Sequence, residues 1–564
     1  MKGDAMDSIL QLINEGMWGR ALEEYLEYTG SHELDDKLCI MGATILEKYG
    51  EYDDMYELIC HGLKLNPENY ELYLLLGNYY AGQNVNKAYL SYENALFYAN
   101  RSGNEEDGKQ ISEIMDSFLA ENEVTVNKVS VILLEDINGD SERCREYLLE
   151  NVQDKEIQIV TGRNEMKDAF GHIFNSFISE LDEENDILLL SNDVCMLPNA
   201  LFNLRMELYS DEKNGACGAI LNNGEYYQVP DDGNERSFEK AKAFARENNL
   251  PDKNSGEIAF ALDNRCSLFK REALSEITPL DEDYKLSLFL DHDICLSLIK
   301  RGYASKACHN SYVFSTVDKD KKKNDSLVYT NVFAADSCLA KEKWGFWPDY
   351  YSNSRVDLIE MITDARDSAI KVLEVGAGLG STLSRIKRLY PKATVKGIEI
   401  VERVAEIGSR MINMECGNIE NYEFASDEKY DYILFGDVLE HLVDPYKLVD
   451  RLKGCLSDGG CIIASIPNIM NAGVIYELLH GNFTYQDSGI LDRTHLRFFT
   501  LNEIKKLFTE RGYEVEETTG INRIDQNTQV NGDFWEKILA IDGVADRVYF
   551  DVFQFLVRAR KTAK

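Results

Sequence analysis

The chain has 564 residues, of which 98 are acidic and 60 are basic, so its formal net charge is −38. A surface this negative repels phosphate backbones and anionic lipids, which argues against nucleic-acid and membrane partners. Apolar residues make up 44 % of the chain. At roughly 150 residues per domain, the length predicts three to four domains with buried cores.

The twelve cysteines are scattered singly, and none forms a C-x-x-C pair. This spacing indicates neither a zinc knuckle nor a disulfide framework. The opening residues MKGDAMDSIL lack the charged start and apolar core of a signal peptide. No apolar run approaches the roughly 20 residues of a membrane helix. We therefore expect a protein of the reduced cytoplasm without a transmembrane segment.

Residues 1–122 are expected to be helical, because small and aromatic residues recur at a fixed period. Gly16, Gly50 and Gly82 each open such a pattern, at intervals of about 33 residues, the length of a stacking helix–turn–helix unit. The best copy spans 66–95, and the segment resembles about three degenerate tetratricopeptide repeats. Repeats of this kind would dock a protein partner or an acceptor. The alternative is a helical bundle that only packs on the next domain.

Short apolar strands alternate with helical patterns in the middle region, which we place at 128–348. The strands expected at 129–134, 156–160 and 186–190 predict a mostly parallel sheet. Asn192 and Asp193 follow the third of them. Ligands of open parallel sheets lie at the carboxyl ends of strands, where a carboxylate could hold a divalent ion against a diphosphate.

Further motifs of the middle region follow in the order FALD (260–263), CSLFKREAL (266–274), LDEDY (280–284), LDHDICLSL (290–298) and KWG (343–345). This order is similar to family 2 glycosyltransferases of the GT-A fold. The resemblance implies that Asn192 and Asp193 bind the nucleotide-sugar donor, with Mn²⁺ or Mg²⁺ held by Asp193. It also implies that Asp291 is the general base of an inverting transfer and that Asp293 supports the site.

The middle region also departs from that family. Ser315 stands roughly where a late histidine often completes the metal shell, and Leu290 stands where an acid usually precedes Asp291. These departures leave open a degenerate domain that binds a sugar or nucleotide without turning it over. The basic run 319–323 is expected to be a solvated loop, with a phosphate-contacting loop as the alternative.

A glycine-rich turn follows a buried strand in KVLEVGAGLGS (371–381), after a linker helix expected over 354–363. Gly376, Gly378 and Gly380 would let the backbone approach a ligand, and the helix that follows offers unpaired N–H groups. The turn alone could serve NAD, although its spacing differs from the dinucleotide G-x-G-x-x-G. Glu399 ends the next strand, where a carboxylate can accept both ribose hydroxyls, and Asn418 follows the third strand.

The continuation YDYILFGDVLEHL (430–442), with SIPN (465–468), resembles the class I S-adenosylmethionine-dependent methyltransferases over 369–560. The resemblance implies a domain at 354–564 that binds S-adenosyl-L-methionine. The cofactor-binding residues it implies are Glu374, Gly376, Gly378, Gly380, Glu399, Asn418 and Asp437. The motifs GNFTY (481–485) and GILDRTHLRFFT (489–500) are similar to methyltransferases found beside, or fused to, bacterial glycosyltransferases.

Methyl transfer to a hydroxyl needs positioning and benefits from a base that titrates near pH 7. Histidine has such a pKa. His495, in the insertion after the fifth strand, and His441, after the fourth, are the candidate catalytic bases. The alternatives are structural: His441 caps a helix, and His495 orders the lid by a hydrogen bond.

Together these patterns predict an α/β multidomain fold, in which a helical repeat segment precedes a GT-A-like domain and a Rossmann-like methyltransferase domain. The predicted function is bifunctional modification of a bacterial surface glycan: transfer of a sugar from a nucleotide-sugar donor, and O-methylation of a sugar. The acceptor would be a polysaccharide or a glycoprotein such as flagellin. The alternative is a methyltransferase whose middle domain only binds glycan, with the repeats as a docking scaffold. Methylation at the nitrogen of an amino sugar also remains open.

Overall fold

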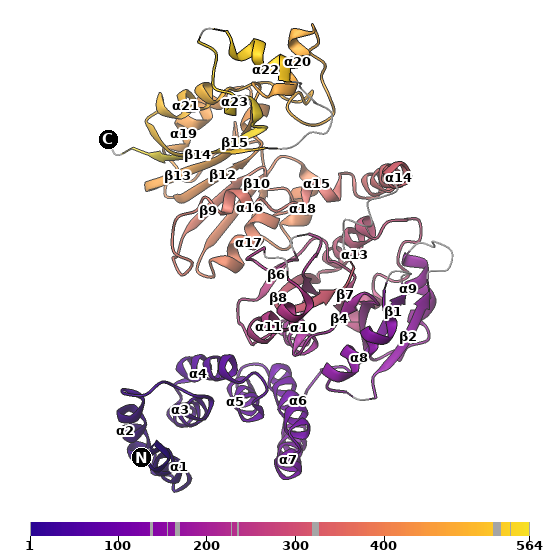
Figure 1. Ribbon diagram of the computed structural model, residues 1–564, viewed down its shortest axis with the longest axis vertical. Coiled ribbons are helices and arrows are strands. Elements are labelled where there is room, and N and C mark those ends of the chain that lie inside the picture. Colours follow the sequence, from indigo (N-terminus) through magenta and orange to yellow (C-terminus); the bar gives the residue numbers. More distant parts are fainter. Residues whose placement is uncertain are drawn as a thin grey trace. The chain divides into compact units, whose positions relative to one another are not determined.

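The chain divides into two compact units, Met1–Trp344 and Gly345–Lys564, shown in the computed structural model of Figure 1. The structure describes residues 2–135, 139–154, 156–163, 170–226, 228–233, 236–317, 326–522, 532–541 and 543–562. The basic run 319–323 lies outside these residues. Within the described part of the chain, no helix has both the length and the apolar character to cross a membrane.

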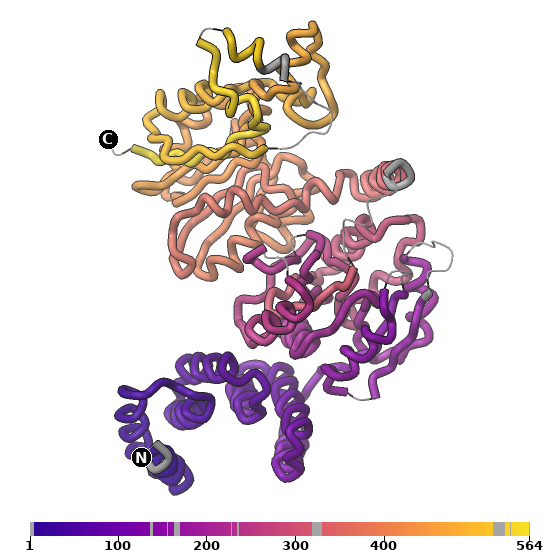
Figure 2. The backbone as a smooth tube through the Cα atoms, in the orientation of Figure 1, coloured from indigo at the N-terminus to yellow at the C-terminus, as the bar shows by residue number. Residues whose placement is uncertain are grey.

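The first unit begins with helices, as the sequence predicted (Figure 2). They are α1 (Lys2–Asn14), α2 (Trp18–Thr29), α3 (Asp36–Tyr49), α4 (Tyr52–Leu65), α5 (Tyr70–Ala81), α6 (Val85–Arg101) and α7 (Glu105–Glu121). A small residue is required where α5 meets α6, because a Cβ on Gly77 would lie 2.1 Å from the ring of Tyr92. Tetratricopeptide pairing of these helices stays a prediction.

The carboxyl-terminal part of this helical segment packs on helix α10 (Ala200–Leu208) of the same unit. The link is Asn199, whose amide donates to the hydroxyl of Tyr73 at 2.9 Å and whose Oδ1 accepts from Tyr98 at 2.9 Å. Arg205 forms an ion pair with Glu93. The three aromatic and amide side chains are buried, so these helices share a core with the α/β part.

The α/β part of the first unit is a mixed sheet in the order β2-β1-β3-β7-β5-β8-β4, with β6 paired to β8. Its strands are β1 (Val129–Glu135), β2 (Gln158–Arg163), β3 (Asp186–Ser191), β4 (Val194–Cys195), β5 (Asn214–Leu221), β6 (Gly256–Ile258), β7 (Cys266–Phe269) and β8 (Ala304–Ser315). The first three strands expected from the sequence are confirmed. The prediction of a mostly parallel sheet is wrong. Strand β7 lies antiparallel between β3 and β5, and β4 and β6 pair antiparallel with β8.

The helices that accompany this sheet are α8 (Ser141–Asn151), α9 (Phe170–Ile178), α10, α11 (Phe238–Asn248), α12 (Arg271–Ser275), α13 (Ser287–Arg301) and α14 (Ser326–Trp344). Helix α13 carries the LDHDICLSL motif, and most of its side chains are buried. Its Asp293 accepts hydrogen bonds from Lys343 and Trp344, each at 2.9 Å. The KWG motif therefore fixes α13 from the end of α14.

The second unit contains a sheet in the order β11-β10-β9-β12-β13-β15-β14. Its strands are β9 (Lys371–Val375), β10 (Thr394–Glu399), β11 (Met414–Cys416), β12 (Tyr430–Gly436), β13 (Leu456–Pro467), β14 (Tyr513–Ile521) and β15 (Gln554–Lys561). The first five of these strands run parallel, and β15 is antiparallel to both of its neighbours. The strand order reverses between β9 and β12, the position at which open sheets of this type bind ligands.

The helices of the second unit are α15 (Pro348–Tyr351), α16 (Val356–Ile359), α17 (Ser381–Leu389), α18 (Glu402–Gly408), α19 (Pro445–Leu452), α20 (Ala472–Leu479), α21 (Leu501–Thr509), α22 (Gly532–Leu539) and α23 (Val548–Asp551), with the 3₁₀ turn η2 (Leu439–His441). The linker helix expected over 354–363 is confined to α16.

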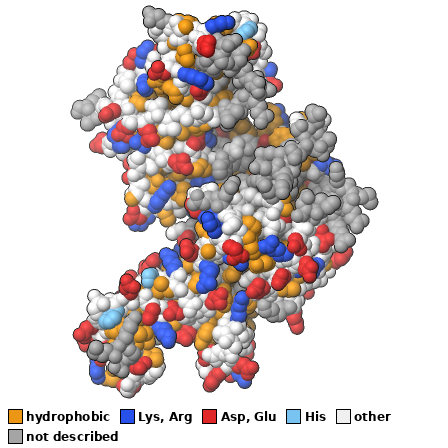
Figure 3. All heavy atoms as spheres, in the orientation of Figure 1, with side chains coloured by type: hydrophobic (Ala, Val, Ile, Leu, Met, Phe, Trp, Pro, Cys, Tyr) orange, Lys and Arg blue, Asp and Glu red, His pale blue; other side chains and the backbone are white. Residues whose placement is uncertain are grey.

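Acidic and basic side chains are interspersed on the visible face of the molecule (Figure 3).

Candidate functional site

The glycine-rich turn after β9 is shaped to receive a ligand against its backbone. Gly376, Gly378 and Gly380 have positive φ angles of 71°, 55° and 99°, which favour glycine. A Cβ on Gly378 would lie 2.5 Å from the carbonyl oxygen of Tyr351, and one on Gly376 would lie 2.7 Å from Val438. Gly380 caps α17, so the turn delivers backbone N–H groups at a helix N-terminus.

Glu399 lies beside this turn, where the sequence placed it. Its carboxylate accepts from the backbone N–H of Gly378 at 3.0 Å and from that of Val401 at 2.9 Å. The N–H of Gly417 donates to the carbonyl of Glu399 at 2.9 Å, which brings the exposed Asn418 to the same edge of the sheet. Burial raises the pKa of Glu399. The carboxyl ends of β9, β10 and β11 therefore meet at one edge of the sheet.

Glu374, inside β9, is a buried acid with an unused oxygen. It is 2 % exposed, and its Oε2 has no hydrogen-bond partner among the described residues. Burial raises its pKa to about 8. A buried carboxylate is stabilised by a nearby positive charge, so Glu374 fits a cationic ligand such as a sulfonium compound.

Asp437, directly after β12, is fixed by a residue that the sequence analysis did not single out. Its Oδ2 accepts from Arg355 at 2.9 Å and its Oδ1 from the hydroxyl of Ser465 at 2.7 Å. The guanidinium of Arg355 also binds Asp357. Both oxygens of Asp437 are thus held by the protein, and these bonds connect the segment before β9 to the carboxyl end of β12. Cofactor binding by Asp437 stays a prediction.

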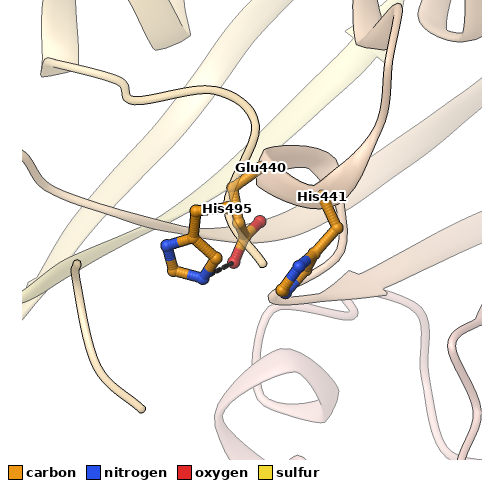
Figure 4. A group of neighbouring side chains, drawn as sticks. All are labelled: Glu440, His441 and His495. Carbon is orange, nitrogen blue, oxygen red and sulfur yellow. Dashed lines mark ion pairs between the residues drawn. The ribbon is translucent and has the colours of Figure 1, made fainter. Parts of the chain in front are cut away.

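The two candidate bases lie together, with a buried acid between them in the view of Figure 4. The ring centroids of His441 and His495 are 4.7 Å apart, and Nε2 of His495 lies 4.0 Å from Oε1 of Glu440. Glu440 is 1 % exposed, and neither of its carboxyl oxygens has a hydrogen-bond partner in the described structure. Burial, with Asp437 nearby, raises the pKa of Glu440 well above its ordinary value.

Hydrogen bonds around the two rings define where each imidazole carries its proton. His495 Nδ1 donates to the carbonyl of Ile490 at 2.9 Å. His441 Nδ1 faces the carbonyl of Thr494 at 3.3 Å and its hydroxyl at 3.2 Å, and that hydroxyl donates to Asp492 at 2.6 Å. Both Nδ1 atoms are therefore donors, which leaves the lone pair of each ring on Nε2. Burial, then the neighbouring His495, lowers the pKa of His441.

The segment 481–500, which contains His495 and is called the lid below, is hydrogen-bonded to the turn that contains Glu440. The backbone N–H groups of Leu496 and Arg497 donate to the carbonyl of Glu440 at 2.9 and 3.0 Å. Beside His495, the ring of Phe498 contacts those of Phe483 and Tyr485. Phe483 and Tyr485 are exposed, so an aromatic wall leads from the surface to the histidines.

The candidate site of the first unit contrasts with this arrangement, because its carboxylates are already paired. Asp193 is 3 % exposed. It accepts hydrogen bonds from the hydroxyl of Ser315 at 2.5 Å and from that of Ser191. The neighbouring Asn192 donates to Ser141 at 3.1 Å. Ser315, at the position expected for a metal-binding histidine, thus binds the aspartate itself.

Asp291 is equally enclosed. Its two oxygens accept from Asn264 at 2.6 Å and from Tyr226 at 3.0 Å. Burial, then the neighbouring Asp263, raises its pKa well above the ordinary value. Arg265, which is paired with Asp263, interacts electrostatically with both Asp193 and Asp291. Asp193 and Asp291 therefore both lie near the Asp263–Arg265 ion pair. The sequence analysis did not single out Arg265, so it did not predict that this pair would lie near both aspartates.

Comparison with known proteins bears on the second unit. Residues 350–518 match a family profile described as Methyltransferase domain. The chain is 25 % identical over 177 residues to a ubiquinone biosynthesis O-methyltransferase of Thiobacillus denitrificans, covering 28 % of this chain and 75 % of that protein. It is 24 % identical over 195 residues to a malonyl-[acyl-carrier protein] O-methyltransferase of Bacillus anthracis, covering 32 % and 70 %.

Among solved structures, an S-adenosylmethionine-dependent methyltransferase from Mesorhizobium loti is 14 % identical, with a TM-score of 0.25, and covers 36 % of this chain and 96 % of that one. The family match spans the glycine turn, Glu399, Asn418 and the Glu440–His441–His495 cluster. Residues 350–518 thus form a class I S-adenosylmethionine-dependent methyltransferase domain.

Proposed function

We propose that the second unit methylates a hydroxyl oxygen of a sugar in a surface glycan or glycoprotein. The observation that carries the proposal is the position of the Glu440–His441–His495 cluster. Val438 contacts the cofactor turn at Gly376, and Glu440 and His441 follow it in the chain. Both relatives named above are O-methyltransferases, which supports oxygen over nitrogen as the acceptor atom.

Bound S-adenosylmethionine would supply a methyl group on a positively charged sulfur. Glu374 would balance that charge, and Glu399 would accept the ribose hydroxyls. The lone pair of His495 Nε2 would take the proton of the acceptor hydroxyl while the carbon–sulfur bond breaks and the carbon–oxygen bond forms. The aromatic wall of Phe483, Tyr485 and Phe498 would hold the acceptor ring, so the protein's main contribution is positioning.

For the first unit we propose sugar transfer from a nucleotide-sugar donor with inversion. Asn192 and Asp193, with Mn²⁺ or Mg²⁺, would bind the diphosphate, and Asp291 would deprotonate the acceptor hydroxyl. The support is geometric: the backbone N–H of Ser191, two residues before Asp193, donates to the carbonyl of Arg265 at 2.8 Å, and the neighbouring Asn264 donates to Asp291 at 2.6 Å. The helical segment would dock the acceptor, such as flagellin or a polysaccharide. Fusion of the two activities would raise the effective concentration of the shared glycan.

A second candidate is favoured by a specific observation in the first unit. Asp193 and Asp291 each have both carboxyl oxygens hydrogen-bonded within the protein. A donor or an ion would have to displace these bonds. Under this reading the first unit recognises glycan without transferring sugar, and the second unit alone is catalytic.

Titration calorimetry with S-adenosylhomocysteine tests the methyltransferase proposal. We expect saturable binding that is lost in Glu399→Ala, and no binding of NADH. NADH binding in place of S-adenosylhomocysteine would overturn the proposal. Methyl transfer from labelled S-adenosylmethionine to sugars of graded structure would then identify the acceptor class.

Titration of UDP, dTDP, GDP and CDP, with and without Mn²⁺, separates the two candidates for the first unit. Metal-dependent binding of one nucleotide that is lost in Asp193→Ala would support sugar transfer. If none of the four nucleotides binds while S-adenosylhomocysteine still does, sugar transfer would be contradicted. Glycan recognition would then be the remaining role of the first unit.

A further inference from the structure

The Glu440–His441–His495 cluster has a feature that methyl transfer by a general base does not use. A general base needs one histidine, whereas the structure brings two imidazoles and a carboxylate together (Figure 4). The ligand atoms that these three side chains offer lie within 4.8 Å of one another. Among the described residues, it is the one group of histidine, cysteine and acidic side chains with this proximity.

Glu440 is the most informative member of the cluster. Its side chain is 1 % exposed and both carboxyl oxygens are without hydrogen-bond partners. Removing a carboxyl group from water without a compensating partner costs several kcal/mol, so nearly all buried polar groups are paired. The group that would satisfy Glu440 is therefore one that binds in this space, and a cation is the partner that a carboxylate prefers.

The histidines are prepared for the same partner. Nδ1 of His495 donates to the carbonyl of Ile490, and Nδ1 of His441 faces the carbonyl and hydroxyl oxygens of Thr494. Metal-binding histidines typically donate one ring N–H to a carbonyl or carboxylate, which orients the ring and leaves the other nitrogen for the metal. Both rings follow that pattern, and Asp492 reinforces it through Thr494.

We propose that Glu440, His441 and His495 bind one divalent transition-metal ion, and that this ion holds the acceptor hydroxyl for methylation. Two imidazoles and one carboxylate suit Fe²⁺, Co²⁺, Ni²⁺ or Zn²⁺, whereas Mg²⁺, Ca²⁺ and Mn²⁺ prefer oxygen ligands. Ligand atoms about 2.1 Å from one ion lie at most about 4.2 Å apart. The cluster therefore has to contract by several tenths of an ångström when the ion binds.

Three protein ligands leave coordination positions open for the acceptor, as in catalytic metal sites. An ion lowers the pKa of a bound hydroxyl, so the proton would leave to water while the oxygen takes the methyl group and sulfur keeps the electron pair of the broken bond. This role of the ion rests on the proposed methyl transfer, whereas the binding site does not. Nε2 of His495 cannot bind the ion and accept the proton at once, so the ion would replace His495 as the activating group.

The experiment is a Co²⁺ titration of the full-length, tag-free chain after dialysis against EDTA, followed by calorimetry and visible absorption. We expect one ion per chain at this cluster, with a ligand-field band typical of nitrogen ligands, in addition to any ion that Asp193 holds. Glu440→Gln keeps the shape of the side chain and should weaken binding at least about tenfold. His495→Gln should do the same. His480→Gln is the matched control, because His480 lies on the exposed end of α20 and its ring bonds to the carbonyl of Tyr476.

Titration of S-adenosylhomocysteine into each variant verifies the fold and separates the two proposals. Co²⁺ binding without S-adenosylhomocysteine binding would retain the metal site and refute methyl transfer. Absence of Co²⁺ binding, binding unchanged in Glu440→Gln, or binding lost in His480→Gln would overturn the metal site. Methyl transfer that is unaffected by EDTA yet lost in His495→Gln would return His495 to the role of general base.

Discussion

The candidate sites of the two units place acidic side chains in comparable burial but treat them differently. In the first unit, Asp193 and Asp291 have hydrogen-bond donors on both carboxyl oxygens. In the second, one oxygen of Glu374 and both oxygens of Glu440 have no hydrogen-bond partner among the described residues. Burial alone therefore does not separate the two candidate sites, whereas the hydrogen bonding of these four carboxyl groups does.

The difference has an energetic consequence. A ligand that reaches Oε2 of Glu374 or the carboxyl group of Glu440 displaces no side-chain hydrogen bond there. At Glu440 it competes only with the longer ion pair to His495, whose Nε2 lies 4.0 Å from Oε1. A ligand that reaches Asp193 must first displace the serine hydroxyls, each bond to a charged group contributing about 1.5–3 kcal/mol. Glu374 and Glu440 of the second unit thus present carboxyl oxygens without hydrogen bonds, whereas Asp193 and Asp291 of the first unit are hydrogen-bonded within the protein.

The largest effect is expected from closing the cofactor turn. Gly378→Ala places a Cβ 2.5 Å from the carbonyl oxygen of Tyr351 at a φ of 55°. We expect complete loss of S-adenosylhomocysteine binding in calorimetry. Gly481→Ala is the matched control, because Gly481 has a φ of 85° and nothing within 4 Å of its Cβ. Both variants carry about 1–2 kcal/mol of backbone strain, so binding retained by both would show that the turn does not contact the ligand.

A smaller effect is expected from His495→Gln, which keeps the lid contacts of a polar side chain but removes the imidazole. Groups that activate the acceptor hydroxyl typically contribute about 10²–10⁴-fold to rate. We expect kcat to fall by about that amount, because His495→Gln removes either the base or a ligand of the activating ion. The affinity for S-adenosylhomocysteine should not change. His480→Gln should leave kcat as in the parent chain. A drop in kcat that is equal in both variants would place the effect in the lid as a whole.

Sequence reasoning found the parts of the second site that depend on local order. The glycine turn, Glu399 and both histidines belong to short motifs that follow strands, and a strand followed by a turn fixes their position in the sheet. Arg355 was missed because it lies in a segment expected to be a linker, and its partner Asp437 is far along the chain. The sequence shows Glu440 only as one residue of its motif. That its buried carboxyl group has no hydrogen-bond partner is visible only in the folded structure.

In the first unit the same reasoning identified β1, β2 and β3 but not the mixed sheet. Strand β7 is only Cys266–Phe269, too short for its direction to be inferred from pattern. The pairing of Asp193 with Ser315 joins β8 to the turn after β3. The sequence analysis noted Ser315 only as a serine where a metal-binding histidine was expected. The fold shows that its hydroxyl binds Asp193.

A moderate effect is expected from Glu374→Gln, and it depends on pH. Because burial raises the pKa of Glu374 to about 8, the folded state holds this proton more tightly than the unfolded state. Its stabilising contribution is full below pH 4.5, the ordinary value, and is lost as the pH rises to about 8. Thermal unfolding of the ligand-free chain should therefore lose a few more °C between pH 5 and pH 8 than that of Glu374→Gln.

The transition to follow is the one that S-adenosylhomocysteine shifts, because it reports the second unit. Glu503→Gln, at a half-buried surface acid paired with Lys506, provides a control for a general change in charge. If the parent chain and Glu374→Gln had the same pH profile, the carboxyl group of Glu374 would have to ionise as an exposed acid does.

The smallest effect is expected from Ser315→Ala, and it tests the other side of the comparison. Ser315 is 2 % exposed and its hydroxyl binds Asp193 at 2.5 Å, so removing it should lower the free energy of unfolding by about 2 kcal/mol. Urea unfolding would measure this in the transition that S-adenosylhomocysteine does not shift. Ser275→Ala, at an exposed serine bonded to its own helix, should change stability by less than about 0.5 kcal/mol. A Ser315→Ala chain that is as stable as its parent and gains Mn²⁺ binding would show that Asp193 is available to an ion. The contrast between hydrogen-bonded acids in the first unit and unbonded acids in the second would then fail at Asp193, the residue on which it most depends.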